Sequence, residues 1–146
     1  MLAGAIKGLA KESKHLTCLA RTTASLNRLE EALDTENFEG VSVDYQNTEQ
    51  FMEVVTAAWE RQPFELVLLW VHSSGAKSLA ALFSFLAEKT PTPQVFHVLG
   101  SAAANPANTT SEPVPGLDYH RIILGFKLEA DRSRWLTHEE ISTGTL

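Results

Sequence analysis

Residues 64–72 read FELVLLWVH, a run that is apolar almost throughout and shows no alternation of apolar and polar positions. A strand of this kind must be covered on both faces, which is typical of a parallel sheet packed between two layers of helices. The polar residues 73–75 (SSG) then turn the chain. This stretch therefore predicts the centre of a parallel sheet covered by helices.

On both sides of this strand the sequence alternates between helical and strand-like patterns. Strands separated by helices of about ten to fifteen residues indicate successive right-handed crossover units. The first half is predicted to contain a helix at 1–10, a strand at 15–20, a helix capped at Thr22 or Thr23, a strand at 41–45 after Gly40, and a helix capped by Asn47 with Gln50. The strand 64–72 follows, and after it come a helix around 79–86 and a strand at 95–101. A long loop at 102–118, a strand at 121–127 and a final helix capped by Thr137 with Glu140 complete the order. The pattern predicts an α/β fold, three-layered and mostly parallel.

Composition excludes several classes of protein. The 146 residues suit one domain, 1–146, and a net charge of −6 argues against a nucleic-acid surface, which needs clustered Lys and Arg. Cys18 is the only cysteine, which excludes an internal disulfide and favours a cytoplasmic location. Residues 1–29 are rich in basic residues, as transit peptides are, but their helix and strand periods favour a folded segment. No apolar run approaches the ~20 residues that span a bilayer, so no membrane contact is expected.

The candidate ligand site follows from the predicted topology. In open parallel sheets, ligands bind beyond the carboxyl ends of the strands. The residues expected there are small and polar, with a spacing that suits a nucleotide: 20–22 (ART), 44–47 (DYQN), 72–75 (HSSG) and 100–102 (GSA).

Two segments, HVLGSAA at 97–103 and RIILGFKLEADRSRWLTHEEIS at 121–142, resemble a bacterial short-chain dehydrogenase-like group within the short-chain dehydrogenase/reductase superfamily. The resemblance covers nearly the whole chain and implies a Rossmann-type fold that binds NADP or NAD. It implies a role for each cofactor-site residue: Gly4 as the middle glycine of the phosphate turn TGxxxGxG, Arg21 for the 2′-phosphate of NADP, Asp44 near the adenine, His72, Ser73 and Gly75 in place of Asn-Asn-Ala-Gly, and Ser101 at the position of the catalytic serine.

The same resemblance implies that a piece is missing. Rossmann-type folds open on a buried strand and a glycine-rich turn, whereas this sequence opens on the predicted helix at 1–10. The Thr-Gly half of the phosphate turn would fall before Met1. We therefore expect the domain to lack its first strand, and a start codon assigned too far downstream would explain this most simply.

The catalytic pattern of the superfamily is also absent. That pattern is Tyr-x-x-x-Lys, in which the ammonium lowers the pKa of the tyrosine. Here Tyr119 is followed four residues later by Ile123, and Tyr45 by Glu49. We therefore expect an NAD(P)-binding relative with weak or no oxidoreductase activity. Two alternatives stay open: an enzyme of another chemistry using Ser101, Tyr119 and residues 132–140, and a non-catalytic interaction or regulatory protein with a vestigial cleft.

Several candidate residues also have simpler interpretations. Arg21 could be a solvated charge, and Asp44 could cap the following helix. His72 and His97 could pair on neighbouring strands, but no further ligand at suitable spacing completes a metal site. The arginines of residues 132–135 (RSRW) could bind a phosphate, or pair with Asp131, Glu139 or Glu140. The implied partners are a nucleotide cofactor and, as an open alternative, further copies of the chain.

Overall fold

The computed structural model describes residues 2–105, 114–129 and 132–145. Helices and strands alternate along most of the chain, as the sequence predicts. The elements are α1 (Ala3–Glu12), β1 (Leu16–Ala20), α2 (Thr23–Leu33), β2 (Phe38–Ser42), α3 (Thr48–Arg61), β3 (Leu66–Leu69), the 3₁₀ turn η1 (Ser73–Gly75), α4 (Ala76–Ala87), β4 (Gln94–Leu99), the 3₁₀ turn η2 (Ser101–Ala104), β5 (Asp118–Ile123), β6 (Phe126–Glu129), β7 (Arg132–Trp135) and α5 (His138–Thr145).

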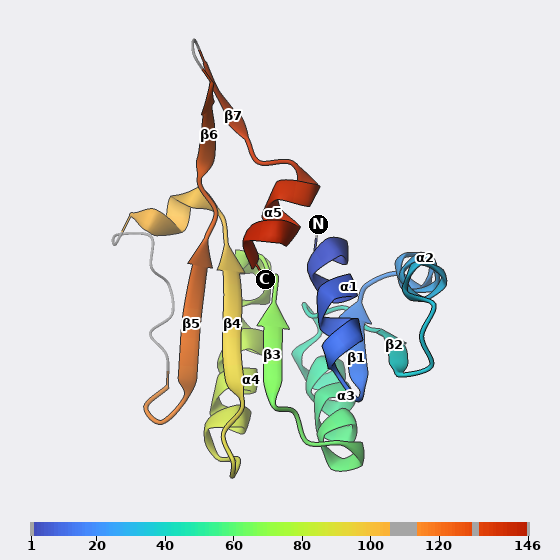
Figure 1. Ribbon diagram of the computed structural model, residues 1–146. Coiled ribbons are helices and arrows are strands. Elements are labelled where there is room, and N and C mark those ends of the chain that lie inside the picture. The colour runs from blue at the N-terminus through green and yellow to red at the C-terminus, as the bar shows by residue number, and fades with distance from the viewer. Residues whose placement is uncertain (1, 106–113, 130–131, 146) are drawn as a thin grey trace.

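The parallel strands form two groups. β1 pairs with β2 in register Leu16 to Phe38, while β4 pairs with β3 on one side and β5 on the other. Figure 1 shows β1, β3, β4 and β5 pointing the same way, with β1 the member of its pair nearer to β3. Within the described residues, no backbone pairing joins β1 to β3. The sheet is therefore divided between these two strands.

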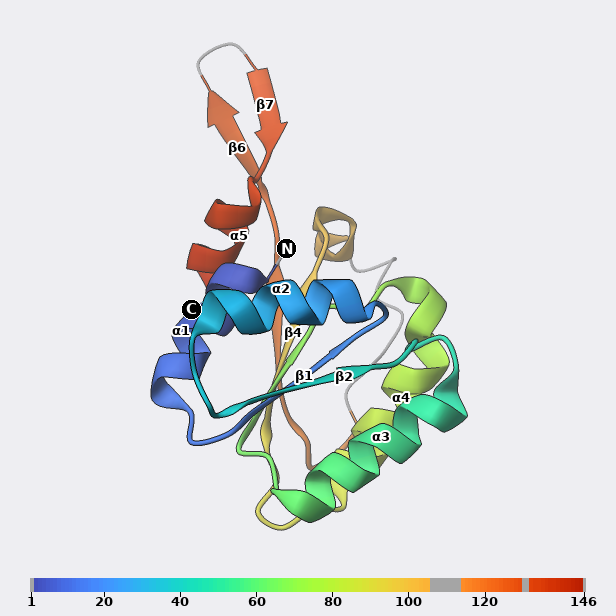
Figure 2. The same cartoon turned by 90° about the vertical axis from the view of Figure 1, so that its right-hand side faces the viewer.

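Helices cover both faces of the strands. Figure 2 shows α3 and α4 on one side, with α1, α2 and α5 toward the other. A hydrophobic core cluster lies on the side of α3 and α4, because their apolar stripes pack together against β3 and β4. It contains Val43, Phe51, Val55, Leu69, Leu79, Leu82, Phe83, Leu86 and Val95. Such an arrangement of helix layers around parallel strands confirms the predicted α/β fold.

Three of the predicted strands differ from expectation. β3 covers only Leu66–Leu69 of the expected 64–72, and β4, not β3, is the middle strand of its three-stranded sheet. The strand expected at 41–45 lies at Phe38–Ser42, because its pairing with β1 begins where the Leu16 N–H donates to the Asn37 carbonyl. Gly40 therefore lies inside the strand, opposite Cys18, and not before it. A Cβ on Gly40 would lie 3.2 Å from Leu26 Cβ, so this glycine lets α2 approach β2 closely.

The predicted strand at 121–127 is two strands. β5 already begins at Asp118, which pairs with Gln94, and the parallel ladder ends where the Leu124 N–H donates to the Leu99 carbonyl. The chain then leaves the sheet, and β6 pairs with β7 in an antiparallel hairpin. Part of the predicted loop at 102–118, residues 106–113, lies outside the described residues, and its first residues belong to η2.

Two of the three predicted helix caps are confirmed by side-chain hydrogen bonds, whereas Thr22 is the N-cap residue of α2 without a side-chain cap hydrogen bond. Asn47 is the N-cap of α3, and its side-chain oxygen accepts from the Gln50 N–H. Thr137 and Glu140 form a full capping box at α5, because each side chain accepts from the backbone N–H of the other residue. Among the described residues, no helix has the length and apolar character needed to cross a membrane.

Candidate functional site

Each predicted site residue after the first helix lies beyond the carboxyl end of a parallel strand. Arg21 follows β1, Asp44 follows β2, and Ser101 follows β4. Residues 72–75 follow β3 by a few residues and include η1. Arg21, His72 and Ser73 are exposed, whereas Gly75 is buried. The parallel arrangement sets these loops along one edge of the molecule, which we call the carboxyl edge (Figure 1).

Hydrogen bonds hold neighbouring loops of the carboxyl edge together. The Ser42 hydroxyl donates to the Arg21 carbonyl at 3.2 Å, which ties the end of β2 to the end of β1. The Gln46 amide donates to the Ser74 hydroxyl at 3.2 Å and crosses the division in the sheet. The loops after β1, β2 and β3 are therefore neighbours.

Gly75 is required by close packing. A Cβ at this position would lie 2.5 Å from Val71 Cγ1 and 2.6 Å from Tyr45 Cδ2, distances that real side chains do not show. Below it, the buried Ser78 hydroxyl donates to the Tyr45 carbonyl and lies 2.9 Å from Thr48 Oγ1. Tyr45 belongs to the expected group 44–47, whereas Ser78 was not expected at this edge, because it lies inside α4 and carries no motif.

Asp44 orders its own turn. Its carboxylate accepts from the Gln46 N–H at 2.9 Å, and its carbonyl accepts from the Asn47 N–H. This pattern is the side-chain to backbone turn that aspartate favours. Asp44 lies three residues before the N-cap of α3, so Asn47 and not Asp44 caps the helix.

Gly4 lies in a helix–helix contact. A Cβ on Gly4 would lie 2.7 Å from Ser142 Cβ, so the first turn of α1 packs directly on α5. Ser142 and Ile141 are both buried there. Figure 1 shows α5 beside the start of α1, on the side toward which the strands point. Sequence analysis assigned no such role to the final helix, because the contact joins the two ends of the chain.

The two histidines that could have paired face different neighbours. His97 is buried in β4, and its Nδ1 lies 2.9 Å from the hydroxyl oxygen of Tyr119. The exposed His72 lies instead with its ring 5.9 Å from that of Trp70. In the described ranges, no group of three His, Cys, Asp or Glu side chains is placed to hold a metal ion.

Burial shifts the titration of His97 and Tyr119. It lowers the pKa of His97, although the Val71 backbone acts in the opposite direction, and it leaves Nε2 without a hydrogen-bond partner among the described residues. Burial likewise raises the pKa of Tyr119, against the charge of Arg121. A catalytic tyrosine needs the reverse shift. Tyr119 is therefore a structural partner of a neutral histidine.

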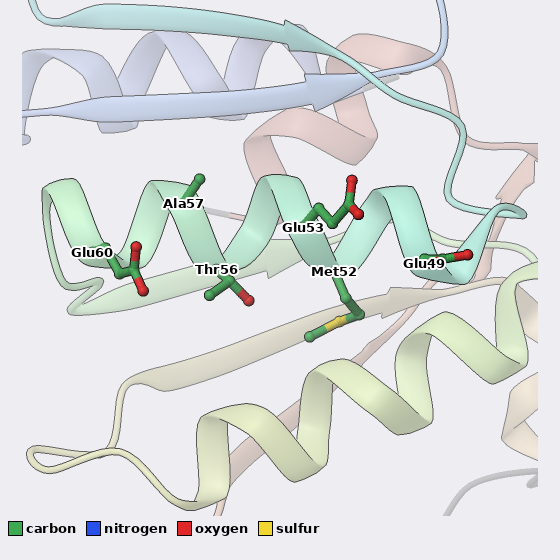
Figure 3. A pocket seen from close by; sticks show the side chains of 6 residues that line it. All are labelled: Glu49, Met52, Glu53, Thr56, Ala57 and Glu60. Carbon is green, nitrogen blue, oxygen red and sulfur yellow. The ribbon is translucent and has the colours of Figure 1, made fainter.

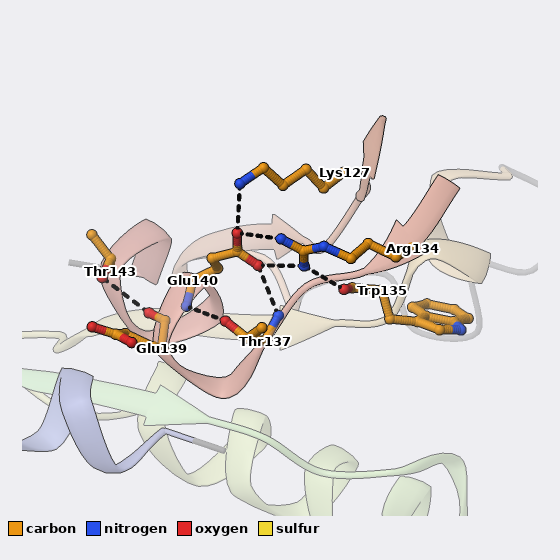
Figure 4. A network of polar contacts seen from close by, with 7 residues as sticks. All are labelled: Lys127, Arg134, Trp135, Thr137, Glu139, Glu140 and Thr143. Atoms are coloured by element: carbon orange, nitrogen blue, oxygen red, sulfur yellow. Dashed lines mark hydrogen bonds and ion pairs between the residues drawn. The ribbon is translucent and has the colours of Figure 1, made fainter. Parts of the chain in front are cut away.

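Residues 132–135 contribute Arg134 to an ion-pair network at the base of the hairpin (Figure 4). Its guanidinium donates to both carboxylate oxygens of Glu140, at 2.8 and 2.9 Å, and Lys127 adds a third contact at 3.0 Å. These donors hold the pKa of Glu140 well below its ordinary value, with Arg134 the largest cause. The predicted pairing of the cluster with Glu140 is therefore confirmed for Arg134.

A shallow hollow runs along one side of α3, from its first turn to its last (Figure 3). It is lined by Glu49, Met52, Glu53, Thr56, Ala57 and Glu60. Its three carboxylates would repel the phosphates of a nucleotide. The hollow therefore does not compete with the carboxyl edge as a nucleotide site.

Comparisons with known proteins identify the fold. No family model matches the sequence, and no curated protein matches it. A crystal structure of a short chain dehydrogenase from Bacillus anthracis is similar, with a TM-score of 0.60 at 12% sequence identity. The match covers 80% of this chain and 55% of that protein, so the chain spans about half of its length. At this identity the likeness establishes the fold, which is a Rossmann-like α/β fold of the short-chain dehydrogenase type.

Proposed function

We propose that this chain is a nucleotide-binding relative of the short-chain dehydrogenases/reductases, which binds NADP or NAD and has weak or no oxidoreductase activity. The observation that carries the proposal is the carboxyl edge of a Rossmann-like sheet, where Arg21, Asp44 and residues 72–75 lie on neighbouring loops. Ligands of such sheets bind at this edge. Ser101 lies at the same edge after β4 and would contact the ligand.

Both tyrosines support the absence of conventional hydride transfer. Tyr119 donates to or accepts from buried His97, and its raised pKa opposes proton transfer near neutral pH. Tyr45 packs its ring edge against Gly75 and has Glu49 four residues later. Neither tyrosine has a lysine at the spacing that the reaction requires. The free thiol of Cys18 remains compatible with the expected cytoplasmic location.

The division of the sheet supports a second part of the proposal. In a doubly wound sheet, the first strand lies between the strands that here are β1 and β3. We infer that a parallel strand belongs between them, and that the glycine-rich turn after it completes the binding site for the pyrophosphate. Gly4, in the first turn of α1, would then be the remnant of that turn that this chain retains.

A titration tests the nucleotide site. Calorimetry with NADPH and NADH is carried out on the chain and on a version extended by the residues encoded upstream of Met1. If Arg21 binds the 2′-phosphate, Arg21→Ala should weaken NADPH binding about tenfold or more, as loss of a charge-assisted hydrogen bond does. NADH binding should change little. Arg28→Ala is the matched control, because Arg28 is an exposed arginine on the next helix.

Three outcomes would count against these assignments. Equal weakening of NADPH and NADH by Arg21→Ala would refute the 2′-phosphate role. If the extended version shows no saturable binding, nucleotide binding is refuted. The remaining alternative is then a non-catalytic interaction or regulatory protein with a vestigial cleft. Efficient turnover of carbonyl substrates by the extended version would contradict the inference drawn from the two tyrosines.

A further inference from the structure

The β6–β7 hairpin separates apolar from polar side chains between its two faces. Its register sets Phe126 opposite Trp135 and Leu128 opposite Ser133. Because side chains alternate between the faces of a strand, these four residues share one face. Lys127 and Arg134, which are also opposite each other, lie on the other face. The first set is called the apolar face below.

The polar face is held against the body of the protein. Lys127 and Arg134 both donate to the carboxylate of Glu140 on α5, which is itself fixed by its capping box. Figure 4 shows the Trp135 ring on the side away from this carboxylate. The network therefore determines which face of the hairpin contacts α5 and which face is left outward.

The described part of the chain leaves the apolar face largely exposed. The exposed fractions are 49% for Phe126, 84% for Leu128 and 65% for Trp135, although the rings of Phe126 and Trp135 contact each other with centroids 4.3 Å apart. The hairpin forms a two-stranded sheet of its own and projects from the body (Figure 1). Two-stranded hairpins are at best marginally stable in water unless another element covers their apolar side.

We propose that this face binds the same face of a second copy of the chain, with the two hairpins antiparallel. The face is self-complementary, as a twofold interface requires. The face consists of two cross-strand pairs, Phe126 with Trp135 and Leu128 with Ser133. A twofold axis that runs between these pairs would set the large Trp135 ring over the partner's Ser133, the one small side chain of the four. The same axis sets Leu128 over the partner's Phe126.

Area and charge predict how strong this contact is. The exposed parts of the three large side chains amount to about 400 Å² per copy, taking fully exposed side chains as about 150–250 Å² each. This is about half of the roughly 800 Å² per partner of a standard interface, so the dimer should be weak and reversible. The apolar face carries no charge, whereas each chain carries a net charge of −6. Added salt should therefore strengthen the dimer by screening repulsion between the copies.

Sedimentation velocity of the whole chain tests the proposal between about 10 and 500 µM, the range suited to a weak interface. The wild type should shift from monomer to dimer across this range, and further at higher salt. Leu128→Lys should weaken the dimer more than about tenfold, because it buries a charge at the centre of the contact. Ala24→Lys adds the same charge at an exposed position of α2 and should leave the dimer constant unchanged.

Other results would overturn the proposal. A wild type that stays monomeric throughout the range refutes it, and so does a dimer that Leu128→Lys leaves intact. Binding of a monomeric wild type to phosphatidylcholine vesicles, lost in Leu128→Lys, would assign the face to a lipid surface. If circular dichroism shows that Leu128→Lys does not fold, Leu128→Ser replaces it, since it removes the apolar contact without adding charge.

Discussion

At the scale of single residues, burial has its clearest effect on groups that can ionise. The Cys18 thiol lies in the middle of β1, and burial raises its pKa to about 11, so it stays protonated and weakly nucleophilic at neutral pH. His97 is held neutral by the same effect, and its contact with Tyr119 gives one ring nitrogen a partner. This burial supports the proposal that these groups act as core side chains and not as reagents.

The His97 environment predicts an acid-sensitive stability. Its pKa is lowered below the ordinary 6.5 in the folded chain, so the unfolded chain binds the extra proton first as the pH falls. The free energy of unfolding should therefore be highest above about pH 6.5 and decrease from there toward the folded pKa. Urea unfolding at a series of pH values measures it. The double variant His97→Phe with Tyr119→Phe should lose this component, because it removes both polar partners together.

Replacement of an exposed histidine provides the control. His138→Gln, at the start of α5, should keep the decrease. A double variant whose stability falls with pH as steeply as that of the wild type would show that other groups cause the effect.

At the scale of elements, the helices were the easier part to predict. The stripes Phe51–Val55–Ala58 and Leu79–Leu82–Phe83–Leu86 are buried as their spacing predicts, because helical periodicity is a local property of the sequence. Strand positions depend on distant partners. β2 lies at Phe38–Ser42 and not at the predicted 41–45, because pairing with β1 fixes its register. No local pattern near Gly40 indicates that pairing.

The hairpin was not predicted for a similar reason. RIILGFK at 121–127 is one apolar run, and its division at Leu124–Gly125 depends on where β4 ends beside it. The carboxyl edge could be predicted because it follows from parallel topology alone. The contacts that organise it, Gln46 with Ser74 and Tyr45 with Gly75, join loops that are about 28 to 30 residues apart, and no local pattern encodes them.

The Glu140 network predicts that one carboxylate connects the hairpin to α5. Glu140→Gln should lower the melting temperature at neutral pH and speed hydrogen exchange of amides in β6, β7 and the first turn of α5. The folded pKa of Glu140 is depressed below 4.5, so this stabilisation is present above pH 4.5 and is lost as the pH falls through the folded pKa. The difference between variant and wild type should therefore narrow in acid.

Glu139→Gln is the matched control for this change. Glu139 is the exposed neighbour on the same helix and loses the same charge. If Glu139→Gln lowers the melting temperature as much as Glu140→Gln does, the loss of stability would come from the helix dipole and not from the ion-pair network. Unchanged exchange in β6 and β7 of Glu140→Gln would show that the hairpin does not depend on α5.

At the scale of the whole molecule, we expect the division between β1 and β3 to limit the stability of the chain. The two groups of parallel strands are joined by the core of α3 and α4 and by the Gln46–Ser74 contact, and among the described residues no strand ladder joins them. Facing strand edges carry backbone N–H and C=O groups that need partners. A strand between β1 and β3 would satisfy both edges and cover apolar surface at the same time.

Extension of the chain tests this consequence. If upstream residues supply the strand, a gain of about 4 kcal/mol should raise the melting temperature by roughly 10 °C, since each satisfied buried group contributes about 1–3 kcal/mol. Circular dichroism melting of the 146-residue chain and of a version extended upstream by about ten encoded residues measures it. A Gly-Ser extension of the same length should have no effect. Equal melting temperatures for all three would contradict the inferred strand.

The placement of the three tryptophans gives the molecule separate optical reporters. The Trp59 ring is edge-on to Phe64 and Phe85 beside the core, Trp70 lies beside His72 at the carboxyl edge, and Trp135 lies on the hairpin. Ultraviolet emission from variants that each keep one indole would thus distinguish unfolding of the core, occupation of the carboxyl edge and contact between hairpins. The chain carries its own intrinsic probe at each place where a structural change is expected, without an added dye.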